Sequence, residues 1–213
     1  EADLSESALA LLQGYADSLQ HGIATQQVNV AHSALARMVT LAPRARITSL
    51  ARLRLALAER NLVAAQAAAK DVSVHPILKE AEIEALFDLA HRLGEHHRVI
   101  ELGSSVSRNL NNTRAIALAR LLIAGPAAAI ETLKEAANAQ VAEAGFLAQE
   151  IAELYLLAND VPAAQKALAE SGIPFKSETG EAYVNRLGWR SAGIDHFSEA
   201  RRSLAACAAG VSP

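Results

Sequence analysis

The chain has 213 residues, of which 51% are hydrophobic, 20% are charged and 4% are aromatic, and its formal net charge is -3. These values are typical of a globular chain and exclude a disordered or fibrous one. The alanine-rich, aromatic-poor composition favours close-packed helices and excludes an all-β fold. No apolar run reaches the ~18 residues that a membrane span needs, so we expect a chain that does not cross a membrane.

A helical hairpin of about 34 residues repeats along the chain. The clearest copy covers residues 151–174, where an Asn159-Asp160 turn separates two helical segments and Pro162 stands in the first turn of the second. That second helix carries a small residue, Ala164, one turn before Leu168. We call the small residue the anchor. The anchors along the chain are Ala31, Ala65, Val99, Ala129, Ala164 and Ala200, with spacings of 34, 34, 30, 35 and 36 residues.

The first helices of these hairpins share a different pattern. A large residue, a small residue and a third residue at helical spacing lie on one face of the helix. The matching triplets are Leu11, Leu12 and Tyr15; Leu86, Phe87 and Ala90; Ile151, Ala152 and Tyr155; and Leu187, Gly188 and Ser191. Turns are expected between paired helices at His21-Gly22, Arg60-Asn61, Gly94, Gly125-Pro126, Asn159-Asp160 and Gly193. Prolines close several hairpins, at Pro43, Pro76 and Pro174.

This pattern resembles the tetratricopeptide repeat (TPR) family, whose unit combines such a first helix, a short turn, an alanine-anchored second helix and a terminal proline. The resemblance implies an all-α, right-handed superhelical solenoid of about six hairpins, forming one repeat domain over residues 1–213. The repeats are degenerate. The fourth unit is about four residues short, and Arg52 and Arg54 interrupt the first-helix pattern of the second.

The resemblance also implies where a partner would bind, because first helices line the concave face in this family. The groove residues that it implies are Glu84, Asp88, His91, Arg92, Arg120, Gln149, Glu153, Leu156, Asn185 and Trp189. Trp189 is the strongest single candidate, since a lone tryptophan among polar neighbours is typical of an interface anchor. The alternative for Trp189 is packing beneath the loop at residues 172–180.

Charge is segregated along the chain. Residues 1–36 carry a net charge of -4, residues 37–120 carry +5, residues 121–185 carry -6 and the remainder carries +2. These blocks are either ordinary solvated helix faces or a bipolar surface that orients a charged partner. No run rich in lysine and arginine and interleaved with aromatic residues accompanies them, so we do not expect nucleic-acid binding.

No pattern in the sequence indicates catalysis or a cofactor. His91, Glu95, His96 and His97 form the one histidine cluster, but Gly94 is expected to end the helix between them, so we expect a solvated turn and no metal site. Cys207 falls on the apolar stripe of the last helix, where a small residue packs. Nucleotide-binding and metalloprotease motifs are absent. We therefore predict no catalytic, cofactor-binding or metal-binding residues.

The predicted function is a non-enzymatic scaffold that binds a partner protein or peptide in its concave groove. Degenerate TPR arrays occur in bacterial envelope machinery, so the resemblance slightly favours an exopolysaccharide secretion assembly and the periplasm. The alternative is an accessory segment of a larger enzyme such as a bacterial glycosyltransferase. Self-association through uncapped ends is a third hypothesis. Because the sequence starts at Glu1 and its last helix resembles an interior unit, we expect a fragment of a longer protein.

Overall fold

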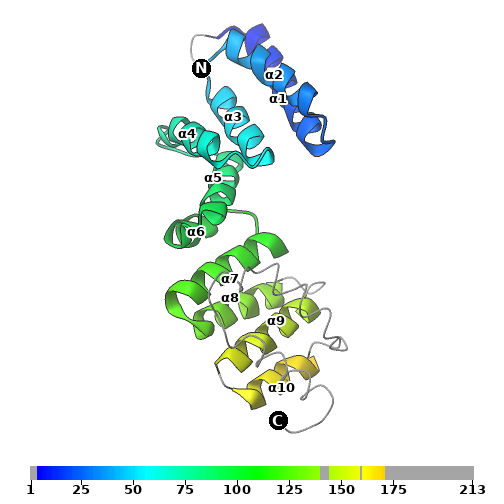
Figure 1. The fold of residues 1–213 in the computed structure, drawn as a ribbon, viewed down its shortest axis with the longest axis vertical. Helices are drawn as coiled ribbons and strands as arrows, with labels where there is room; N and C mark the ends of the chain where they lie inside the picture. The colour runs from blue at the N-terminus through cyan, green and yellow to red at the C-terminus, as the bar shows by residue number, and fades with distance from the viewer. Residues whose placement is uncertain (1–3, 140–143, 159, 171–213) are drawn as a thin grey trace. The chain divides into compact units, whose positions relative to one another are not determined.

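In the computed structural model, residues 4–139, 144–158 and 160–170 are described, and all their regular secondary structure is α-helical. The predicted all-α class is confirmed for this part of the chain. The sixth predicted hairpin, with Ala200, Cys207 and the 172–180 loop, lies outside the described residues. The helices are α1 (Glu6–Ala24), α2 (Val28–Leu41), α3 (Arg46–Ala58), α4 (Leu62–Ser73), α5 (Glu80–Leu93), α6 (His96–Gly103), α7 (Leu110–Ala124), α8 (Pro126–Ala139), α9 (Ala144–Leu157) and α10 (Val161–Glu170) (Figure 1).

The chain divides into two compact units, Glu1–Gly94 and Glu95–Pro213, which we call the N-terminal and C-terminal units. In the N-terminal unit, α1 packs on α2 and α3 on α4, while α3 also contacts α1 and α5. In the C-terminal unit, each of α6, α7, α8 and α9 packs on the helix that follows it along the chain. None of the described helices is both long enough and apolar enough to span a membrane.

Local signals explain where several helices begin. An uncapped helix start leaves backbone N–H groups without partners, and a short polar side chain satisfies one of them. Asn61 accepts a hydrogen bond from the Ala64 N–H at 3.1 Å, and Asn109 accepts one from the Asn112 N–H at 2.9 Å. Pro126 is the first residue of α8, where its missing N–H costs nothing.

The turns between paired helices recur with the period of the sequence. Gln26, Arg60 and Gly94 stand one repeat apart from each other, and all three have positive φ angles, between 57° and 71°. This left-handed conformation ends a helix by a Schellman-type bond, in which an N–H reaches five residues back. Such bonds join the Gln27 N–H to Gly22 O at 2.8 Å and the Asn61 N–H to Ala56 O at 2.9 Å.

The anchors are among the most deeply buried positions of their helices. All five that the structure describes are at most 1% exposed. The helices α1 and α2 approach closely at the anchor Ala31, which leaves room only for a small residue there. A Cβ built on Gly22 of α1 would lie 2.9 Å from the Ala31 nitrogen and 3.2 Å from the Ala31 Cβ. The expected turn at His21-Gly22 is therefore wrong. Gly22 lies inside α1, where it allows the close approach of α2, and the turn follows at Gln26.

Each unit has its own apolar core. In the N-terminal unit, leucines of α1 and α3 pack against the buried face of α2, which presents Ala31, Ala34 and Met38. In the C-terminal unit, the core joins α7, α8, α9 and α10, and Ala129, Leu133 and Ala164 lie within it. Small residues on the second helices therefore set the distance between paired helices, as the sequence pattern predicts.

Candidate functional site

An open cleft of about 470 Å³ lies in the N-terminal unit, between α1 and α3 and beside the start of α5. Its floor is apolar and includes Leu9 and Leu12 of α1, Ile47 and Leu50 of α3, and Ala81 of α5. When a ligand's apolar side chain covers such a surface, binding is favoured by about 25 cal/mol for each Å² of apolar surface removed from water. An apolar floor with a few polar groups around it is the usual character of a binding site.

Polar side chains surround the apolar floor. Gln13, Asp17 and Gln20 of α1 form one wall. The Gln13 amide donates to Asp17 Oδ1 at 2.8 Å, which holds both side chains along α1. Across the cleft, Arg54 of α3 reaches Gln20 Oε1 with its Nη1 at 3.5 Å. This wall offers amide donors and acceptors and both signs of charge to a ligand.

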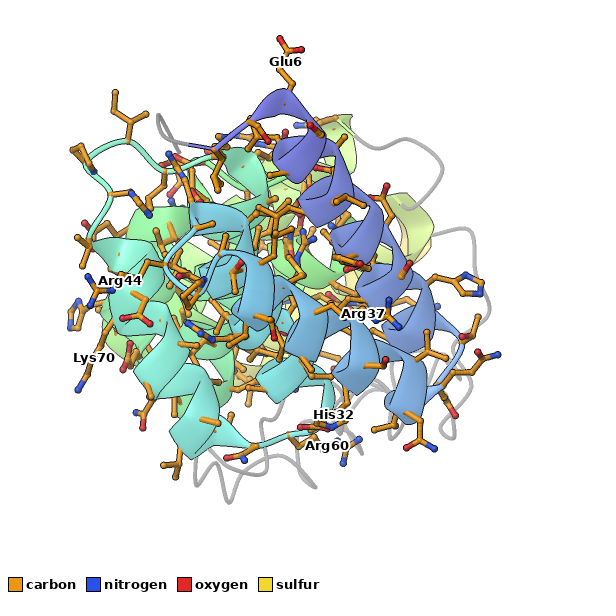
Figure 2. The ribbon with its side chains drawn as sticks, turned by 90° about the horizontal axis from the view of Figure 1, so that it is seen from above. Glu6, His32, Arg37, Arg44, Arg60 and Lys70 are labelled. Carbon is orange, nitrogen blue, oxygen red and sulfur yellow. The ribbon has the colours of Figure 1, made fainter. Side chains whose placement is uncertain are left out.

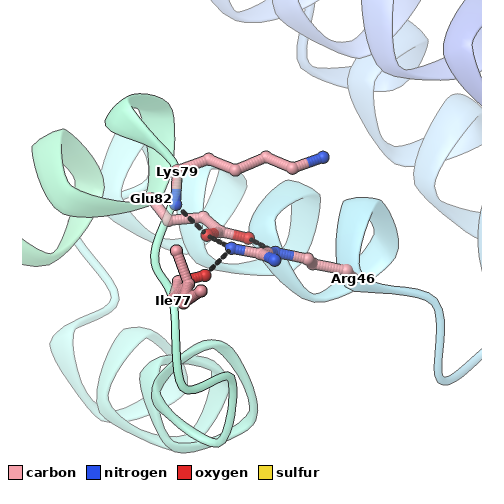
Figure 3. A network of polar contacts seen from close by, with 4 residues as sticks. All are labelled: Arg46, Ile77, Lys79 and Glu82. Atoms are coloured by element: carbon pink, nitrogen blue, oxygen red, sulfur yellow. Dashed lines mark hydrogen bonds and ion pairs between the residues drawn. The ribbon is translucent and has the colours of Figure 1, made fainter.

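A polar network closes the other end of the cleft (Figure 3). Arg46, the first residue of α3, pairs with Glu82 of α5 through both its Nε and Nη2, and its Nη2 also donates to Ile77 O at 2.5 Å. Glu82 Oε2 also accepts the Lys79 backbone N–H at 2.7 Å. The carboxylate thereby caps the first turn of α5 and fastens α3 to α5.

The Glu82 carboxylate is 1% exposed, yet it remains charged. Burial alone raises the pKa of this group. The hydrogen bonds from Arg46 and from the Lys79 N–H, together with the positive charge of Arg46, outweigh burial and hold the pKa of Glu82 below its ordinary value of 4.5. At neutral pH the pair therefore contributes no net charge to the cleft.

A second buried ion pair stands at a related place in the C-terminal unit. Arg114 of α7 contacts Glu150 of α9, with its Nε 2.6 Å from Oε1, and the carboxylate side chain is fully buried. Both pairs span 36 residues, and the second lies two repeats after the first. Each pair joins one predicted first helix to the next one along the chain. These pairs were not predicted.

The predicted groove residues of α5 lie partly on the surface. Asp88 and Arg92 pair with each other through two contacts of 2.8 Å, and Arg92 Nη1 also donates to Leu57 O of α3 at 2.8 Å. Glu84 is half-buried, and His91 is exposed. None of the four lines the cleft, but their role in binding remains a prediction.

The remaining predicted groove residues belong to the C-terminal unit. Arg120 donates to Thr132 Oγ1 at 3.0 Å and lines a smaller cleft of about 150 Å³ on α6, α7 and α8. Gln149 and Glu153 are each 6% exposed and so present little surface. The Leu156 side chain, Asn185 and Trp189 lie outside the described residues.

The repeat itself could have located the cleft. The first-helix pattern indicates Glu84 and Asp88 because it is clear in α5, whereas arginines obscure it in α3. Counting back from the same two positions by whole repeats nevertheless leads to residues that line the cleft. One and two repeats earlier, these are Leu50 and Arg54, then Ala16 and Gln20.

Exposed cations do not offer a rival site. Residues 28–79 carry eight lysines or arginines and two acidic residues. In Figure 2, Arg44 and Lys70 project on one side of the N-terminal unit, whereas Arg60 projects on another. The positive charge is therefore spread around the unit, and the cleft is the better-defined site.

Within the described ranges, no three His, Cys, Asp or Glu side chains come together as a group that could hold a metal ion. No protein-family model matches the chain, and no curated protein matches its sequence.

Proposed function

We propose that the chain is a helical-repeat module of the TPR type and that it binds a peptide segment of another protein in the cleft of its N-terminal unit. The observation that carries the proposal is the cleft itself. It lies on α1, α3 and the start of α5, which are the first helices of the predicted hairpins. A binding scaffold of this kind performs no catalysis.

Periodic features support the repeat assignment. The left-handed turn residues recur once in each repeat, at Gln26, Arg60 and Gly94. The anchor follows each of them by five residues. A period shared by sequence, turn conformation and burial is expected of repeats that stack on their neighbours. Stacking of such hairpins would generate the right-handed superhelix.

The shape and composition of the cleft favour a peptide over a small metabolite or a flat protein surface. Its apolar floor runs along two neighbouring helices and stays open to solvent. A peptide could place apolar side chains on the floor while Gln13 and Gln20 hydrogen-bond to its backbone. In such sites, a small number of well-placed polar groups around an apolar floor fixes the orientation of the ligand.

Selection from a displayed library of random peptides tests the proposal. We expect the chain to enrich peptides that a Gln13→Trp variant does not retain, because the indole would cover the apolar floor from an exposed position of α1. Gln66→Trp is the matched control, since Gln66 is exposed on α4 and does not line the cleft. Circular dichroism verifies that both variants remain helical.

Equal retention by the wild type and both variants would place binding elsewhere and refute the proposed site. The groove residues of α5 and the C-terminal unit form a second set for the same selection, with Asp88→Ala as its first variant. The setting of the protein, including an exopolysaccharide secretion assembly, remains a prediction from the sequence.

A further inference from the structure

We propose that the preferred occupant of the cleft is an extended peptide in which an apolar residue stands midway between two acidic residues four positions apart. This inference rests on the proposed function, because it names the chemistry of the peptide that the same cleft would take. The charges at the two ends of the cleft and the length of the cleft support it.

The charges of the cleft do not cancel. Arg46 and Glu82 neutralise each other, which leaves Arg54 and Lys79 against a single carboxylate, Asp17. No ion pair of Arg54 or Lys79 occurs among the residues that the structure describes. Two cations therefore remain available to acidic groups of a ligand.

These cations stand at opposite ends of the cleft. Lys79 lies beside the Arg46–Glu82 pair, and Figure 3 shows its side chain extending from the start of α5 toward α3. Arg54 lies at the other end, where it contacts Gln20. Arg46 and Arg54 are eight residues apart on one helix, which corresponds to about 12 Å at 1.5 Å per residue.

An extended peptide matches this spacing. Residues i and i+4 of an extended strand lie about 13 Å apart, and they share one face with residue i+2. Because Lys79 lies beside the Arg46 end of this span, acidic side chains at i and i+4 would lie near Lys79 and Arg54. The side chain at i+2 would meet the apolar floor between them, which Leu9, Ile47 and Leu50 form.

The negative charge of Asp17 affects the affinity of the cleft for charged peptides in a direction that can be measured. Its carboxylate lines the same wall as Gln20, the residue that Arg54 contacts. It repels an acidic ligand and attracts a basic one. Removing its charge should therefore strengthen the binding of an acidic peptide, whereas removing either cation should weaken it.

Three synthetic peptides serve as probes: Ser-Glu-Ser-Phe-Ser-Glu-Ser and its counterparts with Gln or Lys in place of both Glu residues. NMR titration of the isotopically labelled chain at low ionic strength measures each affinity. We expect the Glu peptide to bind most tightly. Because exposed ion pairs contribute modestly, Arg54→Gln and Lys79→Gln should each weaken its binding about two- to fivefold, and Asp17→Asn should strengthen it about twofold.

Arg60→Gln provides the control, because Arg60 is exposed and lies outside the cleft lining. Its effect reports the general loss of one positive charge. A Gln peptide that binds as tightly as the Glu peptide would overturn the inference and leave the proposed function standing. Equal effects of Arg54→Gln and Arg60→Gln would overturn it as well.

The absence of binding by all three peptides also overturns the inference. Library selection then decides the proposed function independently. Cleft-dependent peptides without the acidic pattern would retain peptide binding as the function, and a selection that yields none would refute both.

Discussion

Two glycines of α1 provide a matched test of the packing between α1 and α2. Gly14 and Gly22 are both helical, but a Cβ at Gly14 would meet no atom within 4 Å. A Cβ at Gly22 would lie 2.9 Å from the Ala31 nitrogen and 3.1 Å from Gln27 O. Both of these are backbone atoms, so a change of side-chain rotamer cannot relieve the overlap.

The expected free-energy changes follow from this difference. In a helix, alanine is favoured over glycine by roughly 0.5–1 kcal/mol, and Gly14→Ala should gain that amount. The gain in stability from helix propensity is no larger for Gly22→Ala than for Gly14→Ala. Forcing a methyl group into a packed interior costs about 1–3 kcal/mol. The turn cannot move freely, because the Gln27 N–H is bonded to Gly22 O at 2.8 Å. We therefore expect the overlap to outweigh the gain in propensity, so that Gly22→Ala is destabilising by about 1–2 kcal/mol in net.

Urea unfolding followed by circular dichroism at 222 nm measures both variants. The midpoint should rise for Gly14→Ala and fall for Gly22→Ala, with an unchanged slope. A Gly22→Ala midpoint equal to or above that of the wild type would refute the close approach of α2 at this position. A fall for both variants would instead indicate that α1 does not tolerate substitution generally.

The other predictions concern the buried ion pair and the last described hairpin. Glu82→Gln leaves the Arg46 charge without its carboxylate and should cost about 3 kcal/mol in urea unfolding at pH 7; an unchanged midpoint would contradict this. Because the folded-state pKa of Glu82 is lowered, its contribution to stability is complete above its unfolded value of 4.5 and is lost as the pH falls through the folded value. Acidification below pH 4.5 should therefore narrow the stability difference between wild type and Glu82→Gln, and a gap that persists would disprove the linkage. Ala164→Leu should destabilise by about 1–3 kcal/mol, because the anchor is 1% exposed. The control is Ala169→Leu, at an exposed position of α10, and equal unfolding midpoints for the two variants would argue against the anchor alignment.

Sequence periodicity predicted the helices and the buried anchors well, because helix pairing imposes a strict size limit. Ala31 and Ala164 are recognisable for this reason, since only small residues fit there. At Gly22, the presence of a small residue led to the wrong prediction of a turn. Glycine indicates a turn as readily as a close approach, and the actual turn residue, Gln26, carries no such signal.

The cleft proposed as the binding site was harder to predict than the helices. Residues that face a groove are free to vary, so Leu50 and Arg54 share no residue type with Glu84 and Asp88 at the equivalent positions. The two buried ion pairs were equally difficult to predict from the sequence. Arg46 and Glu82 are 36 residues apart, and nothing in either local sequence indicates that the two side chains are buried together.

The ion pair between α3 and α5 also determines where the chain could be shortened. A piece that ends after α4 keeps both helices of the second hairpin but loses the carboxylate that faces Arg46. The guanidinium would then lose its contacts with Glu82 and with Ile77 O. Because this pair fastens α3 to α5, a piece of the N-terminal unit that keeps the contact must extend into α5, at least as far as Glu82. The shortest piece that preserves this contact is therefore set by a side chain that reaches into the following hairpin.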